Sequence, residues 1–282
     1  MPGIFTVGSI EDGRLSDNGV SAGLRGMVYC PALARGAPPA HRAGVVLAFY
    51  PTVPHKPISN VGTHGMFEGA TARRLMVDGQ VRTADVTDAA LLDAMMTVPR
   101  ERFVPPALAQ VAYLDDDIPV GGGRALLKPM VLAKLIQAAG IGREDRVLDV
   151  GCATGYSSAI LARVAGAVTA LEENEELARQ AKAALAQIDA TGVQIVVGPL
   201  TAGWPAAAPY DAILLNGATE IVPEGLGRQL KPEGRLTGID RRSRAGKGTI
   251  YRVVEGVLVG RPIFDASAPL LPGFAATPSF AF

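Results

Sequence analysis

The sequence predicts an α/β fold in which a mostly parallel sheet carries helices on both faces. From Arg146 to residue 239, short apolar runs rich in β-branched residues alternate with segments at helical spacing, which is typical of β-α-β units. Two further apolar runs, 248–254 and 257–264, are separated only by Glu255-Gly256, as in a β-hairpin. These patterns predict a doubly wound, mostly parallel seven-stranded Rossmann-like sheet with an antiparallel C-terminal hairpin.

The composition argues against several classes of protein. The chain has 27 Lys+Arg and 27 Asp+Glu, so no global charge favours nucleic acid. The longest apolar run near the start, 43–50, is far shorter than a membrane span. Cys30 and Cys152 are too few for a disulfide framework, and the three histidines lack metal-ligand spacing. We therefore expect a cytoplasmic protein with no metal, no membrane contact and no nucleic-acid partner.

Three parts of the chain differ in their patterning. Residues 1–65 are rich in glycine, proline and alanine without periodicity, which predicts a disordered or spurious extension. Residues 66–265 are predicted to form the main domain, with an N-terminal helical cap at 66–140. Residues 266–282 are predicted to be a C-terminal tail, and the stretch after Pro269 is expected to lie over the surface because prolines interrupt it.

Regular structure in the helical cap is expected from about Met76. A helix with leucines and methionines on one face follows Thr87 or Asp88, either of which can be its N-cap. Further on, a short helix is expected at 105–113, a mobile segment at Gly121-Gly-Gly123, and a helix from Pro129 to Ala139 with Gly140 as its C-cap.

The sheet is built from seven predicted strands and three predicted helices. Asn174 is the expected N-cap of the second helix, and Pro223 is expected to open the third. The strands are expected at 146–150, 167–172, 193–198, 209–216, 234–239, 248–254 and 257–264, and the helices at 157–164, 175–187 and 223–230.

The turn after the first of these strands is the most informative stretch. Gly151 and Gly155 stand where the backbone must turn tightly and let a ligand approach. Glu172 ends the next strand, about 20 residues later, where a carboxylate can accept hydrogen bonds from both ribose hydroxyls of a nucleoside. The two glycines lie four apart and do not form the dinucleotide pattern G-x-G-x-x-G, which favours S-adenosylmethionine. The sequence thus predicts a class I methyltransferase.

Several segments together resemble the protein-L-isoaspartate O-methyltransferases, which methylate isoaspartyl carboxylates of damaged proteins. The resemblance runs from about Met66 to Val254 and is most specific in Val98-Pro-Arg-Glu-Arg-Phe-Val-Pro105 and Ala208-Pro-Tyr-Asp-Ala-Ile213. It implies S-adenosylmethionine as cofactor and an isoaspartyl-containing protein or peptide as partner. The cofactor-binding residues that it implies are Asp149, Gly151, Cys152, Ala153, Gly155, Tyr156, Glu172 and Glu173.

Two segments depart from the family pattern. The family's substrate loop reads Gly-Gln-Thr-Ile-Ser-Gln-Pro, and its hydroxyls hold the acceptor carboxylate. The equivalent stretch here is Gly123-Arg-Ala-Leu-Leu-Lys-Pro129, so Ala125 and Leu127 replace the threonine and the serine. The family's Gly-Asp-Gly, whose aspartate contacts the adenine, is Gly198-Pro-Leu200 here, and the Pro199 side chain forms no hydrogen bond.

Acceptor binding then has to use other residues. Arg124 and Lys128 can hold a carboxylate by charge, or can be exposed residues beside a helix start. Asn216 can orient the acceptor or cap the following turn. No general base is needed, because a carboxylate is already ionised near neutral pH.

Two other functions stay open. The first is a binding protein that keeps the fold and the cofactor but has lost or altered its acceptor specificity, and acts as an adaptor or sensor. The second is a methyltransferase for RNA or a small molecule, which only the basic run Arg241–Lys247 suggests; this run is also typical of a solvated loop.

Overall fold

The computed structural model describes residues 65–243 and 245–277, which all belong to one compact unit, Ile58–Phe282. Residues 1–64 of the predicted N-terminal extension, which include Cys30 and the three histidines, lie outside the described residues. The last five residues of the predicted tail, 278–282, lie outside them as well. The boundaries predicted for these parts stay predictions.

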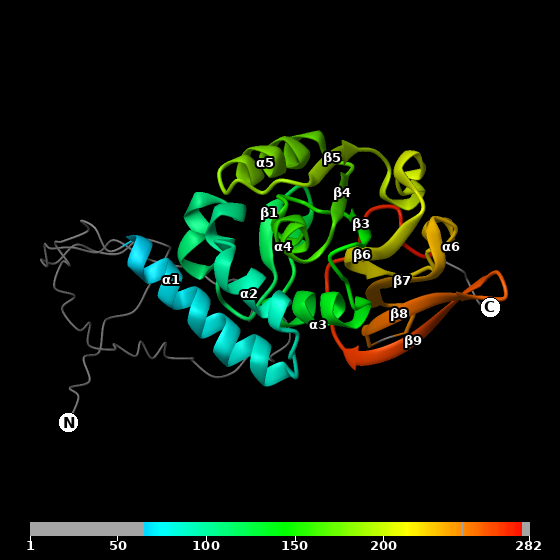
Figure 1. Cartoon of the computed structure of the whole chain (residues 1–282), viewed down its shortest axis with the longest axis horizontal. Coiled ribbons are helices and arrows are strands. Elements are labelled where there is room, and N and C mark those ends of the chain that lie inside the picture. Colours follow the sequence, from blue (N-terminus) through cyan, green and yellow to red (C-terminus); the bar gives the residue numbers. More distant parts are fainter. Residues whose placement is uncertain (1–64, 244, 278–282) are drawn as a thin grey trace, which may run out of the picture. The chain divides into compact units, whose positions relative to one another are not determined.

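Seven strands form one sheet in the order β5-β4-β3-β6-β7-β8-β9 (Figure 1). Neighbours from β5 to β7 are parallel, and β8 and β9 are antiparallel, which confirms the predicted fold class. Strand order reverses at β3, whose neighbours are β4 and β6, and ligands of such sheets bind at the strand ends beside this reversal. The strands are β3 (Arg146–Val150), β4 (Ala167–Glu172), β5 (Val193–Val197), β6 (Tyr210–Thr219), β7 (Leu230–Asp240), β8 (Lys247–Val254) and β9 (Val257–Asp265).

Different elements bury the two faces of the sheet. Successive side chains of a strand point to opposite faces. Accordingly, Val147 and Leu214 pack into a cluster with residues of α3 (Pro129–Ala139), α4 (Tyr156–Val164) and α5 (Glu175–Ala186). Leu148 and Leu215 pack into a second cluster with Leu226 of α6 (Glu224–Gly227). Helix α6 is a single turn and is shorter than the helix predicted at 223–230. The second face of the sheet is therefore covered mainly by irregular chain.

Regular structure in the helical cap begins earlier than the sequence predicted. Helix α1 (Gly65–Met76) precedes a π-helical turn (Val77–Val81) and a 3-10 turn (Arg82–Ala84), so the expected start near Met76 is wrong. Helix α1 is held at its end by Met76, which is buried in the core. Polar contacts hold it as well: Arg73 Nε donates to the Tyr113 hydroxyl at 3.0 Å, and Arg73 Nη2 pairs with Glu101 at 3.4 Å.

The helix ends largely follow the predicted caps. Asp88 is the N-cap of α2 (Ala89–Thr97), and Asn174 is the N-cap of α5. Helix α3 begins at Pro129 and ends at Gly140, whose φ of 56° is left-handed. The predicted helix at 105–113 is a 3-10 helix, Pro106–Val111, which follows another 3-10 turn, Arg100–Phe103.

The segment predicted to be mobile at Gly121–Gly123 is the turn of a small hairpin. Strand β1 (Ile118–Gly121) pairs antiparallel with β2 (Arg124–Leu126). A Cβ at Gly122 would lie 2.8 Å from the Asn174 side chain, so the hairpin turn packs against the start of α5. The hairpin therefore lies beside the end of β4.

The C-terminal segment does not lie over the surface as expected. The amide of Ala218 in β6 donates to the Pro269 carbonyl at 2.8 Å, and the Leu271 amide donates back to Ala218 at 2.9 Å. Leu271 and Phe274 are fully buried in the second cluster. This segment, red in Figure 1, runs back to the β3 and β6 region. The prolines ended regular structure without preventing burial.

Candidate functional site

The glycine-rich turn between β3 and α4 is tied to the neighbouring strand. The amides of Gly151 and Cys152 both donate to the Leu171 carbonyl of β4, at 2.8 and 3.1 Å. Positive φ angles of 73° at Gly151 and 93° at Gly155 explain why glycine is needed there. A Cβ at Gly155 would also lie 3.1 Å from the Ala181 methyl of α5. The turn is therefore fixed in the shape that lets a ligand reach its backbone.

Glu172, at the end of β4, is buried against this turn. Its Oε2 accepts a hydrogen bond from the Ala153 amide at 2.8 Å. Its Oε1 accepts from the Glu173 and Asn174 amides at 3.1 and 3.3 Å. Glu172 therefore lies against the glycine turn, and its predicted role toward the ribose stays a prediction. The exposed Glu173 contributes only its backbone.

Arg124 differs most from what its sequence position suggested. Its side chain is 3% exposed, so it is not a residue on the surface beside a helix start. Its Nη2 donates to the Gly151 carbonyl at 2.6 Å, and its Nε lies 3.5 Å from Oε2 of Glu172. Arg124 thus reaches from the hairpin into the place where the nucleoside was expected.

Asp149 lies behind the turn and holds it to its surroundings. Its Oδ2 accepts from the hydroxyls of Ser157 and Ser158 at 2.7 and 2.6 Å, and its Oδ1 accepts from the Asn216 amide. Burial raises the pKa of the Asp149 carboxyl to about 6, although these three hydrogen bonds act in the opposite direction. Asn216 is therefore attached to the glycine turn through Asp149 rather than acting as a helix or turn cap.

Two other predicted residues of the turn have structural surroundings. Cys152 is buried, and burial raises the pKa of its thiol well above the usual range, so the thiol stays protonated. Tyr156 is buried with its ring beneath the Arg100 guanidinium, 4.7 Å from the ring centroid. Neither side chain is a candidate nucleophile.

The helical cap supplies contacts that the sequence reading did not assign. Thr154 of the turn donates to the Phe103 carbonyl at 2.5 Å. Arg100 is fully buried and donates to the carbonyls of Ala112 and Leu127 at 2.7 and 2.8 Å. Both Arg100 and Phe103 belong to the run Val98–Pro105 that carried the family resemblance. That run was the sequence signal for the packing of the helical cap against the glycine turn.

The residues expected to face the acceptor are not all brought together. Ala125 and Leu127 line a small cavity with Gly151 and Asn216. Lys128 instead pairs with Asp116 at 3.9 Å, while its backbone amide donates to Asp117 at 2.9 Å. Of the two predicted cations, only Arg124 reaches the glycine turn.

The space above the turn is nearly filled. The cavity has a volume of about 10 Å³, which suits about one water molecule, whereas ligand pockets span roughly 300–1,000 Å³. A Cβ at Gly151 would collide with the Arg124 guanidinium and lie 3.0 Å from Leu271. The backbone of the turn and the Glu172 carboxylate fit a nucleoside cofactor, but the side chains of Arg124 and Leu271 occupy its place.

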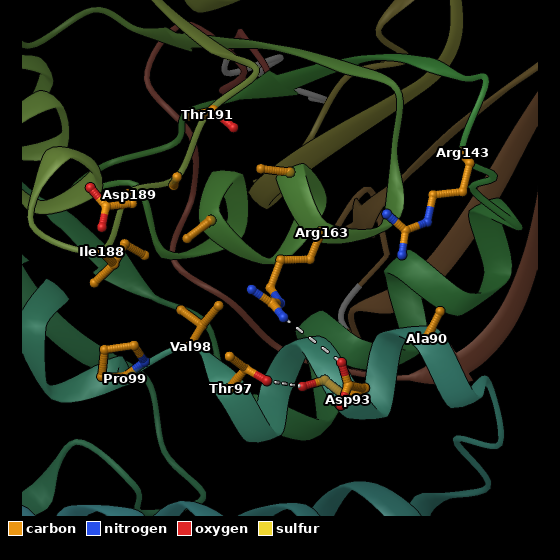
Figure 2. Close-up of a pocket in the computed structure, with 13 residues that line it drawn as sticks. Ala90, Asp93, Thr97, Val98, Pro99, Arg143, Arg163, Ile188, Asp189 and Thr191 are labelled. Carbon is orange, nitrogen blue, oxygen red and sulfur yellow. Dashed lines mark hydrogen bonds and ion pairs between the residues drawn. The ribbon is translucent and has the colours of Figure 1, made fainter.

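A larger hollow of about 310 Å³ lies elsewhere, between α2, α4 and the turn that precedes β5 (Figure 2). Its lining carries charges of both signs, and Arg163 pairs there with Asp93 at 3.9 Å. None of the predicted site residues lines it.

The basic run near Arg241 is largely neutralised by carboxylates. Arg241 pairs with Glu220 at 2.8 Å, Arg242 with Asp240 at 2.6 Å, and Lys247 with Asp265. The pairing fits a solvated loop better than an RNA contact.

The described residues contain neither a metal-binding cluster nor a membrane-spanning helix. Over 65–243 and 245–277, no three His, Cys, Asp or Glu side chains are grouped so that they could hold a metal ion. Over the same ranges, no helix has the length and apolarity needed to cross a membrane.

Comparisons with known proteins place the chain in one family. Residues 72–242 match the family model described as protein-L-isoaspartate(D-aspartate) O-methyltransferase. The protein-L-isoaspartate O-methyltransferase of Methylorubrum extorquens (strain PA1) is 47% identical over 167 residues, which are 59% of this chain and 73% of that protein. The enzyme of the same name from Ignicoccus hospitalis is 35% identical over 205 residues, covering 71% of this chain and 94% of the relative.

A solved structure has the same fold. It is a protein-L-isoaspartate O-methyltransferase from Plasmodium falciparum, described as putative and in complex with S-adenosyl-L-homocysteine, with a TM-score of 0.60 at 17% identity, covering 71% of this chain and 97% of that one. At this identity the likeness shows the fold. Because the family model spans more than half of the sequence, the chain belongs to the protein-L-isoaspartate(D-aspartate) O-methyltransferase family of S-adenosylmethionine-dependent enzymes.

Proposed function

We propose that this protein transfers a methyl group to a carboxylate of a protein or peptide, with an isoaspartyl residue as the acceptor and the cytoplasm as its location. The observation that carries the proposal is the meeting of Glu172, the glycine turn and Asn216 of β6 beside the ends of β4 and β3. In a parallel sheet these strand ends, at the reversal of strand order, are where a cofactor and its substrate meet.

The chemistry asks little of the protein's side chains. When bound, the cofactor supplies a methyl group attached to a sulfonium sulfur, and this sulfur centre is itself the leaving group. The acceptor carboxylate is ionised near neutral pH, so no side chain has to remove a proton. What the chain must provide is alignment and exclusion of water. The buried surroundings of Gly151, Asn216 and Leu127 are suited to excluding water.

Alignment of the acceptor is assigned in this proposal to Arg124 and Asn216. Arg124 presents a forked guanidinium that matches a carboxylate, but it can turn to an acceptor only after leaving Glu172. The Asn216 Nδ2 donates one of its hydrogens to Asp149, and its second N–H can donate to the acceptor carboxylate. Lys128, paired with Asp116, plays at most a role in long-range attraction of the acceptor.

A second candidate is a protein of the same family that binds the cofactor without methylating isoaspartate. The supporting observation is the replacement of the family's substrate hydroxyls by Ala125 and Leu127. Leu127 is 3% exposed and packs in the core, so its side chain cannot replace the lost hydroxyl. An altered acceptor or a sensor function would follow.

The two functions are separated by one assay. The full chain is incubated with S-adenosylmethionine labelled in its methyl group and with an isoaspartyl peptide, and base-labile label in the peptide is counted. The control is the peptide of identical sequence with an ordinary aspartyl residue. We expect label only in the isoaspartyl peptide. Label in neither peptide, from a chain that binds the cofactor, would favour the second candidate.

A further inference from the structure

The Arg124 guanidinium is buried at the cofactor site with incomplete pairing. Its Nη2 has a good hydrogen bond to the Gly151 carbonyl, at 2.6 Å. Its Nε is buried and has no hydrogen-bond partner, and the Glu172 carboxylate lies 3.5 Å from it. A buried charge is stable only when well paired, so this position holds Arg124 less firmly than full pairing would.

The contacts of Glu172 show which partner can be exchanged. Three backbone amides, of Ala153, Glu173 and Asn174, donate to its two oxygens. A carboxylate has about four acceptor positions, so these amides leave about one, and the Arg124 guanidinium lies beside it with Nε 3.5 Å from Oε2. The amides are fixed by the chain, whereas the Arg124 side chain can rotate away. A ribose hydroxyl can therefore reach Glu172 only when Arg124 leaves.

The turn of the hairpin that carries Arg124 consists of residues with wide backbone freedom. These are three consecutive glycines, Gly121 to Gly123, all with positive φ. Glycine has access to more backbone conformations than any other residue, so the angle at which β2 leaves the turn can change at low cost. Strand β2 has three residues and, within the described part of the chain, pairs with β1 alone.

We propose that Arg124 is an internal competitor of the cofactor for Glu172, so that S-adenosylmethionine binds only to the fraction of molecules in which the guanidinium has left the site. This inference rests on the proposed function, because it concerns the same cofactor site. The apparent affinity for the cofactor is then lower than the intrinsic affinity by the fraction of open molecules. Arg124 thereby sets the cofactor concentration at which the protein works.

The test compares cofactor affinity in variants of the full chain. S-adenosylhomocysteine is used as the probe because it cannot be turned over, and its binding is measured by calorimetry. Arg124→Gln introduces the residue found in the family's substrate loop, so it suits the hairpin. We expect it to bind S-adenosylhomocysteine more tightly than the wild type, on the order of tenfold. Arg179→Gln, which removes an exposed arginine paired with Glu176, is the matched control and leaves the affinity unchanged.

A second variant and a second readout cover the case in which Arg124→Gln folds poorly. Arg124→Lys keeps the charge but has no forked guanidinium with which to reach Gly151 and Glu172 together. Its affinity for S-adenosylhomocysteine is therefore expected to lie between those of the wild type and Arg124→Gln. Without ligand, both variants are expected to melt below the wild type, and ligand raises their melting midpoints by more. A purely structural Arg124 would lower the stability without raising the affinity.

The possible outcomes distinguish the competition from the proposed function. Affinity that rises in the order wild type, Lys, Gln supports the competition. Equal or weaker binding by both variants, with methyl transfer by the wild type intact, overturns the competition alone. No binding of S-adenosylhomocysteine by any of the proteins overturns the proposed cofactor site and the competition with it.

Discussion

The ionisation of the buried Asp149 carboxyl affects the stability of the folded state. Burial raises the pKa of its carboxyl from 3.8 to about 6. Because the pKa is higher in the folded protein than in the unfolded chain, the contribution of Asp149 to stability is fully present below about pH 4. It is lost as the pH rises through about 6. At neutral pH the carboxylate is ionised, and its hydrogen bonds hold Asn216 and the first turn of α4 in place.

This loss of stability at neutral pH predicts that the free energies of unfolding of the wild type and of Asp149→Asn differ by an amount that depends on pH. The amide has a similar shape and does not titrate, so the free energy of unfolding of the wild type relative to the variant should fall by about 2 kcal/mol between about pH 4.5 and about pH 7.5. Urea unfolding of both proteins at the two pH values measures it. A difference that does not change with pH would contradict the raised pKa.

Ala125 is the residue at which a single hydroxyl can be restored. It is half-buried, on β2, and lines the small cavity beside Gly151. We expect Ala125→Thr to raise kcat/KM for an isoaspartyl peptide by up to about tenfold, the worth of one hydrogen bond made to the acceptor. Ala125→Val, with the same shape and no hydroxyl, is the control in the same transfer assay. An equal rise with valine would show that the hydroxyl is not what matters.

Among the elements, helix α2 shows how one side chain fixes a helix start. The Asp88 carboxylate accepts from the amides of Ala90 and Leu91 at 2.9 and 3.0 Å. The sequence left Thr87 and Asp88 as alternative caps, and the structure selects Asp88. The Thr87 amide instead donates to the Gln137 side chain at 2.7 Å.

The cap of α2 leads to a stability prediction. Asp88→Ala should lower the free energy of unfolding by about 1 kcal/mol, because two amides at the helix start lose their acceptor. Thr87→Ala, which removes an exposed side chain next to it, should change it by less than about 0.5 kcal/mol. Chemical denaturation of the two variants provides the comparison. Equal losses would mean that Asp88 does not act as the cap.

The C-terminal segment is a second element with a measurable contribution. Leu271 is fully buried and touches the glycine turn, whereas its neighbour Leu270 is half-buried. Leu271→Ala should cost about 2–5 kcal/mol of stability, and Leu270→Ala less. Thermal or urea unfolding tests this. A segment lying on the surface would give two small and similar changes.

For the whole molecule, the sequence predicted the features that depend on local patterns. Strands such as Arg146–Val150 are buried on both faces and therefore appear as short apolar runs, and the glycine turn with Glu172 has a fixed spacing. The position of Arg124 depends instead on contacts with residues 27 and 48 positions away. The return of Leu271 to β6 likewise depends on pairing across the sheet. No periodicity in the chain encodes such contacts.

The arrangement of the molecule as a whole places the chemistry at one edge of the sheet. The hairpin, the glycine turn and the C-terminal segment all meet at the ends of β3, β4 and β6. They come from three separate parts of the sequence, so the site forms only when the sheet is complete. These parts pack against each other in this structure, and the proposed competition requires the cofactor to displace Arg124 from among them.

The most direct test is a crystal structure of the full chain grown with saturating S-adenosylhomocysteine. We predict the nucleoside at the ends of β3 and β4, with its ribose hydroxyls on the Glu172 carboxylate and with Arg124 withdrawn from that carboxylate. Ligand density at another place, or an unchanged Arg124–Glu172 pair with no ligand beside the glycine turn, would contradict a methyltransferase site at this edge of the sheet.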